Sequence, residues 1–190
     1  MIRIYKVVPL LLMILPVNLQ DIRPVGVCRH ETRYDRQADI TTVQCDNLIR
    51  WGEAPAGLTV KANTSFPGKE SIRGIELSES TKFWLALSSN RGVATRQTRP
   101  LFQEATTLYL STDSARLEIP VKDYRKTFFE LIRSLEESAR AEINPEDLQK
   151  LLSAKSLEGK WGSIEFKFSA AALASLKGFI SHQVFGAPSR

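Results

Sequence analysis

The 190-residue chain has few of the residue types that carry chemistry. It contains only two cysteines and two histidines, and His30 and His182 lie near opposite ends of the sequence. It has no Gly-x-Ser-x-Gly nucleophile motif, no His-Glu-x-x-His zinc motif, no Walker loop and no Rossmann glycine pattern. These absences exclude the enzyme classes that such local motifs mark, and we expect no cofactor.

The cysteine spacing also argues against a metal site or a redox pair. Structural zinc sites need four converging ligands, and Cys28 and Cys45 have only His30 nearby. A thioredoxin-like pair has two residues between its cysteines, whereas here sixteen residues intervene. We therefore expect no metal ligands. Separate buried thiols and a disulfide are the two remaining interpretations.

A disulfide between Cys28 and Cys45 is the preferred interpretation. Val25 and Val27 alternate with polar or small residues before the first cysteine, and the residues before the second are β-branched. With residues 34–39 as the tip of an antiparallel hairpin, the two cysteines come to lie opposite each other. Such a bridge forms in an oxidising compartment.

The N-terminus indicates export. Residues 1–20 begin with a short basic stretch, continue with an apolar run from Val7 to Val17, and end in polar residues, as in a signal peptide. The run is too short to span a bilayer. Pro9 and Pro16 interrupt it, which argues against a signal peptide. The alternative is a buried element of the mature domain. We expect a signal peptide over 1–20, a single globular domain over 21–190, and a periplasmic or extracellular location.

The first part of the domain reads as strands. Apolar residues alternate with polar ones, or β-branched and aromatic residues cluster, in several short segments separated by turn residues. Pro120 lies in the last of these segments and favours an edge position for it. The expected strands are 58–62, 75–78, 82–88, 106–111 and 115–121.

The second part reads mainly as helices. Residues 123–142 show apolar side chains at helical spacing and opposite charges four residues apart, which predicts an amphipathic helix. Asn144 is a candidate N-cap for a second helix, with Pro145 at its first position, and Gly159 is expected to end the connection that follows it. Residues 161–168 predict a strand, and Ser169 a cap for a third helix. His182, near the end of that helix, suits the negative end of its dipole.

The expected fold class is therefore α+β, with a mostly antiparallel sheet or partial sandwich in the N-terminal and middle part. About three amphipathic helices follow in the C-terminal part.

One basic segment is a candidate binding site. Arg91, Arg96 and Arg99 lie in a polar connection that holds no acidic residue, and arginines there can donate hydrogen bonds to carboxylates or phosphates. The alternative is an ordinary solvated loop. The net charge of +5 is small for a nucleic-acid binder, so no nucleic acid is expected. Asn63 begins an Asn-Thr-Ser triplet, a formal glycosylation acceptor.

The preferred function is an exported, non-enzymatic binding or interaction domain: an envelope-associated factor, or an inhibitor of a secreted enzyme. Its partner would be a protein or an anionic envelope or glycan ligand, and no transmembrane span is expected. The alternative is a small exported hydrolase whose site is assembled from distant residues. A deep cleft where His30 meets carboxylates would favour the hydrolase, and a shallow surface with arginines around exposed aromatics would favour binding.

Overall fold

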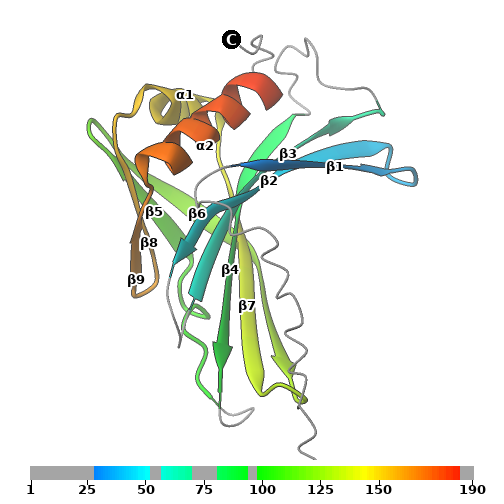
Figure 1. The fold of residues 1–190 in the computed structure, drawn as a ribbon, viewed down its shortest axis with the longest axis vertical. Helices are drawn as coiled ribbons and strands as arrows, with labels where there is room; N and C mark the ends of the chain where they lie inside the picture. The colour runs from blue at the N-terminus through cyan, green and yellow to red at the C-terminus, as the bar shows by residue number, and fades with distance from the viewer. Residues whose placement is uncertain (1–27, 52–56, 70–80, 94–97, 185–190) are drawn as a thin grey trace, which may run out of the picture.

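The computed structural model describes residues 28–51, 57–69, 81–93 and 98–184. In these parts the chain forms nine strands and two helices (Figure 1). The strands are β1 Arg29–Asp35, β2 Ile40–Trp51, β3 Gly57–Pro67, β4 Lys82–Gly92, β5 Thr107–Thr112, β6 Arg116–Phe129, β7 Ser134–Glu142, β8 Leu157–Trp161 and β9 Ile164–Lys167. The helices are α1 Pro145–Ser153 and α2 Ala170–Gln183.

All nine strands belong to one antiparallel sheet in the order β1-β2-β3-β4-β7-β6-β5-β8-β9. Strand β6 joins the two halves of the sheet, because residues 116–120 pair with β5 and residues 121–129 pair with β7. A register shift between Lys122 and Arg125 marks the junction, and Asp123 there has a φ of 53°. The bulge turns β6 from one half into the other.

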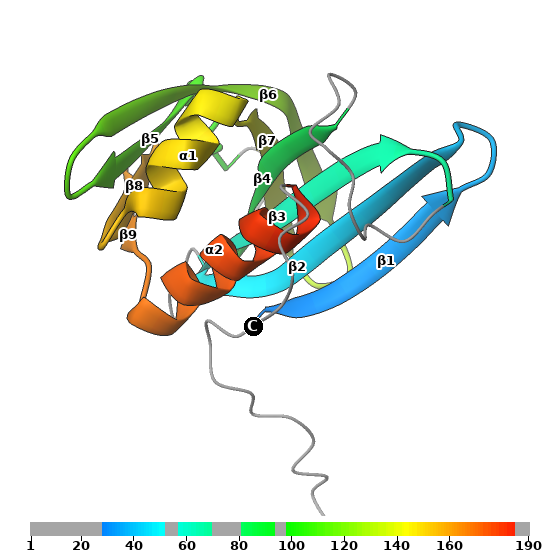
Figure 2. The same cartoon turned by 90° about the horizontal axis from the view of Figure 1, so that it is seen from above.

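Both helices cover the same face of the sheet, which curves around them (Figure 2). Helix α2 packs against β2, β3 and α1. The hydrophobic core lies between the sheet and the two helices. Its largest fully buried side chains include Phe83, Trp161 and Phe179. At the end of the molecule opposite the helices, β4, β7 and β6 extend past the rest of the fold (Figure 1).

The expected α+β class and the predominance of antiparallel sheet are confirmed, but the first expected helix is wrong. Residues 123–142 form the end of β6, a turn and all of β7. The structure therefore describes two helices where the sequence predicts about three. The other two helices begin as predicted: the side chain of Asn144 accepts a hydrogen bond from Asp147 N, and that of Ser169 accepts one from Ala172 N.

Pairing with neighbouring strands explains why residues 123–142 are not helical. Strand β7 lies between β4 and β6, so its backbone groups are hydrogen-bonded along both edges. Leu135, Glu137, Ala139 and Ala141 alternate along β7 and are buried. The buried position of this alternation that Glu137 occupies is charged, so the sequence does not show the apolar period of two that indicates a strand. The remaining apolar residues match a helical spacing instead.

Two details of the C-terminal half also differ from expectation. Gly159 lies inside β8 rather than at the end of a connection, and a Cβ there would be 2.2 Å from the Phe166 ring on β9. Glycine is needed because the ring occupies the space of a side chain. Pro120 does not place β6 at an edge, since β6 lies between β7 and β5. Pro120 itself pairs with Thr107 of β5, and pairing with β7 begins only at Val121, so the missing N–H of Pro120 is tolerated.

The disulfide between Cys28 and Cys45 is present, with Cα atoms 5.1 Å apart. The predicted hairpin is β1–β2, but its register differs from expectation, because Cys45 lies opposite His30. Cys28 lies just before β1 and reaches Cys45 diagonally. Cys45 is fully buried in the core, so the bridge fastens the start of the edge strand to the interior.

Some expectations fall outside the described residues: the signal peptide over 1–20, the strand over 75–78, and Arg96. Asn63 is described and is 4% exposed within β3. A glycan on this side chain does not fit the folded sheet. Neither of the two described helices has the length and apolar character needed to cross a bilayer.

Candidate functional site

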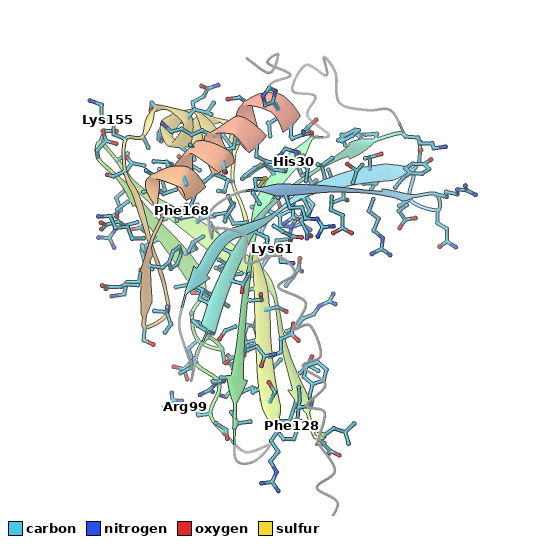
Figure 3. All side chains as sticks on the ribbon, viewed as in Figure 1. His30, Lys61, Arg99, Phe128, Lys155 and Phe168 are labelled. Atoms are coloured by element: carbon cyan, nitrogen blue, oxygen red, sulfur yellow. A yellow bond between two sulfur atoms is a disulfide. The ribbon has the colours of Figure 1, made fainter. Side chains whose placement is uncertain are left out.

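Exposed apolar side chains gather at the turn between β6 and β7. Leu131 is 101% exposed, Ile132 is 68% exposed, and Phe129 at the end of β6 is 41% exposed. Figure 3 places the neighbouring Phe128 at the end of the molecule farthest from the helices, together with Arg99. We call residues 125–134, with Arg99, the distal end. Large apolar side chains in contact with water on one turn are characteristic of interaction surfaces.

Basic side chains flank these apolar residues. Arg125 and Lys126 on β6 are exposed, as is Arg133 in the turn. Together with Glu130 they give residues 125–133 a net charge of +2, from three basic residues and one acidic residue. The distal end therefore combines exposed apolar side chains at its tip with Glu130 and Arg133 in the turn itself, and with the basic Arg125 and Lys126 just behind it.

The turn is held in place by hydrogen bonds to the end of β4. The backbone N–H of Val93 donates to the carbonyl of Arg133 at 2.8 Å, and the Ser134 hydroxyl donates to the side chain of Asn90. Arg133 itself has a φ of 45°, a left-handed conformation that closes the turn tightly. The apolar side chains therefore project from a fixed turn.

A buried carboxylate fixes the connection that follows β4. Glu137 on β7 is fully buried and accepts hydrogen bonds from the backbone N–H of Leu101 at 3.0 Å and of Phe102 at 2.9 Å. It also accepts one from the Tyr124 hydroxyl at 2.9 Å. Phe102 in turn stacks on Trp161, with ring centroids 3.8 Å apart. Glu137 thus ties the crossing segment to the sheet.

The predicted arginine site is divided between internal and exposed roles. Arg91 is largely buried: its Nε lies 3.8 Å from the Glu137 carboxylate, and its guanidinium donates to the backbone carbonyl of Arg99. Arg99 itself is exposed and pairs with Glu104 at 3.1 Å. The structure therefore brings Arg91 and Arg99 together, but only Arg99 presents its charge to solvent. Binding of an anion by these residues stays a prediction.

The ionisation of Tyr124 reflects its place beside Glu137. Burial and the hydrogen bond to the carboxylate both raise the pKa of Tyr124 above its ordinary value, and the nearby positive charge of Arg91 opposes this effect. The phenol consequently stays protonated and keeps donating to Glu137 at neutral pH. This arrangement stabilises the fold.

The two histidines meet in space, away from the distal end. Burial, and secondarily the charge of His182, lower the pKa of His30. The described contacts of His30 are an edge-on approach to the Phe179 ring at 5.5 Å and a 3.5 Å approach of its Nδ1 to the Gln183 amide. These neighbours hold a neutral imidazole against helix α2. They are not the carboxylates that a His-dependent hydrolase needs.

A hollow lies along β5, β8 and β9, away from the distal end. Its volume is about 680 Å³, and its polar walls carry both charges. Lys160 pairs with Glu165 and Lys167 with Glu158, both at 2.8 Å. The charges of this face are thus largely satisfied by one another across the strands. Within the described residues, no group of three or more histidine, cysteine or acidic side chains could hold a metal ion.

Sequence reasoning missed both Glu137 and the tip. The amphipathic helix predicted over residues 123–142 would put Glu137, four residues from Arg133, on its solvated side and Leu131 and Ile132 on its buried side, which reverses what the structure shows. The consecutive apolar residues in Phe128-Phe129-Glu130-Leu131-Ile132 fit neither period cleanly. That irregularity, between two alternating segments, was the available signal for a hairpin tip.

Comparisons with known proteins add no family or activity. The chain matches no family model, no curated protein and no solved structure.

Proposed function

We propose that the protein is an exported, non-enzymatic binding domain that engages an anionic partner surface through its distal end. The observation that carries this proposal is the exposure of Leu131, Ile132 and Phe129 on one fixed turn. Removing a large apolar side chain from water contributes about 1.5–3 kcal/mol. Folding does not use this free energy at the tip, so it is available for association.

The charges around the tip favour an anionic partner. Arg125, Lys126 and Arg99 are exposed, and the ion pair of Arg99 with Glu104 is itself exposed to solvent. Surface pairs of this kind contribute only about 0–1 kcal/mol and exchange readily for a partner's acidic groups. The basic residues would steer an anionic surface toward the apolar turn.

The location outside the reducing interior rests on the disulfide. Bridges of this kind persist in oxidising compartments and are rare in the cytosol. The apolar N-terminal stretch adds support from the sequence. We therefore propose that the domain lies in the periplasm or the extracellular space, in association with the cell envelope.

Retention on immobilised heparin tests the proposal. The distal variant Arg99→Gln/Arg125→Gln/Lys126→Gln removes three exposed charges at the proposed surface. A matched control, Arg116→Gln/Lys155→Gln/Lys167→Gln, removes three exposed charges elsewhere. Figure 3 shows Lys155 at the opposite end of the molecule from Arg99.

The proposal predicts that the distal variant elutes at clearly lower salt than the control variant, because its charges lie at the proposed binding surface. Equal elution of the two variants would mean that only bulk charge matters, and would refute a binding surface at the distal end. Arg91 is left unchanged in both proteins, because its substitution would disturb Glu137 rather than the surface.

A further inference from the structure

We infer that the partner of the distal end is a lipid bilayer with anionic headgroups, into which the β6–β7 turn inserts shallowly. This inference rests on the proposed function and names the class of surface bound. Four features of the turn support it: its apolar content, the position of its basic residues, its fixed shape and its place at the end of the sheet that extends past the helices.

The apolar content matches an interfacial anchor. Leu131 and Ile132 occupy adjacent positions of the turn, and Phe129 lies beside them at the end of β6. Proteins that bind a membrane surface bury such side chains about 5–10 Å into the boundary between headgroups and acyl chains. A hairpin tip also buries few backbone groups, because the strands behind it are already hydrogen-bonded to each other.

Two of the basic residues lie at the right depth, behind Glu130 and Arg133 of the turn itself. Lys126 is three residues from Phe129, which is about 10 Å along an extended strand. With the apolar tip below the headgroups, Lys126 and the adjacent Arg125 would lie at the level of the phosphates. Basic residues near an anionic leaflet each favour binding by electrostatic attraction.

The turn is presented ready for insertion. Arg133 closes it in a left-handed conformation, and the backbone bond from Val93 ties it to β4. Insertion therefore orders little additional chain, and the conformational entropy lost on binding is small.

The shape favours a bilayer over a protein or a second copy. A specific protein interface buries about 800 Å² on each partner across a broad, complementary surface. Here the apolar residues lie at the end of the part of the sheet that extends past the helices, with basic residues behind them (Figure 1), and a fluid surface can surround such an end. A second copy would bring the same positive charges together, which opposes self-association at this end.

A fluorescent label at the tip tests the inference. Both cysteines of the chain form the disulfide, so Leu131→Cys introduces the only free thiol for an environment-sensitive dye such as nitrobenzoxadiazole. Vesicles of phosphatidylcholine with phosphatidylglycerol, and vesicles of phosphatidylcholine alone, serve as the probes. Lys155→Cys, at the opposite end of the molecule, is the matched control.

The expected result is a blue shift and an increase of emission for the label at position 131 with the anionic vesicles. With phosphatidylcholine alone the change should be much weaker, and the label at 155 should not respond. In parallel, unlabelled Leu131→Ser/Ile132→Ser should bind anionic vesicles at least about tenfold more weakly than the wild type. Exposed residues are changed, so thermal unfolding should be unaltered.

Three results would overturn the inference: no spectral change at 131, equal changes at 131 and 155, or undiminished vesicle binding by the serine variant. The heparin measurement separates this failure from that of the proposed function. Loss of heparin retention in the distal variant, without vesicle insertion, would leave a binding surface for an acidic protein or glycan. Loss of neither would remove both.

Discussion

Replacing Glu137 by glutamine should destabilise the fold strongly. The carboxylate accepts three hydrogen bonds, two from backbone N–H groups of the segment that crosses from β4 to β5 and one from Tyr124. Glutamine keeps the size of the side chain but turns an amide N–H₂ toward those donors. It also removes the negative charge beside the largely buried Arg91.

The magnitude follows from burial. The side chains of Glu137 and Arg91 are 1% and 13% exposed, so solvent replaces little of what is lost. Removing one partner of a buried ion pair costs about 3–5 kcal/mol, because the other charge stays buried. In a domain of this size the melting temperature falls roughly 2–4 °C per kcal/mol. We therefore expect Glu137→Gln to lower it by roughly 6–20 °C.

Urea unfolding and thermal melts of Glu137→Gln and Glu136→Gln provide the measurement. Glu136 is the neighbouring residue on β7, and its side chain is only half-buried. Its substitution should stay within about 0.5 kcal/mol of the wild type. A loss of less than about 1 kcal/mol for Glu137→Gln would refute the reasoning, since it would match a solvated glutamate and not a buried one.

Three further predictions concern stability. Replacing both cysteines by alanine should cost about 3 kcal/mol, and the wild-type mass should rise by two hydrogens on reduction; an unchanged melting point would contradict the bridge. Gly159→Ala should lower the free energy of unfolding by at least about 1–3 kcal/mol, because its Cβ would meet the Phe166 ring. Gly178→Ala in α2, where a Cβ would have nothing within 4 Å, should raise it by up to about 1 kcal/mol. Similar effects at both glycines would be inconsistent with the packing. Because the pKa of Tyr124 is raised in the folded state, its contribution to stability is complete below the unfolded pKa of about 10 and declines as pH rises above that value. The melting temperature should therefore decline less between about pH 9 and 11 in Tyr124→Phe than in the wild type. An identical decline in both proteins would exclude this linkage.

Local signals in the sequence predicted the elements whose ends are fixed by neighbouring residues. Asn144 and Ser169 cap α1 and α2 as expected, since a cap needs only a side chain and the backbone two or three residues ahead. The hairpins β1–β2 and β5–β6 were likewise visible from alternation and turn residues. The disulfide was predictable because the hairpin brings its cysteines together.

The sheet order and the distal end could not be read in this way. Whether residues 134–142 form helix or strand is decided by β4, which lies more than forty residues earlier and pairs with β7. The burial of Glu137 likewise depends on backbone N–H groups of Leu101 and Phe102, contributed by a different segment. Exposure of Leu131 and Ile132 follows only once the hairpin is known, because the helical spacing would have buried them.

Photo-crosslinking in the native compartment tests the central claim most directly. A photoreactive amino acid at position 131 should form adducts with lipid or another envelope component on illumination, whereas the same amino acid at position 155 should not. Adducts at neither position, or equally at both, would contradict the assignment of the distal end as the binding surface.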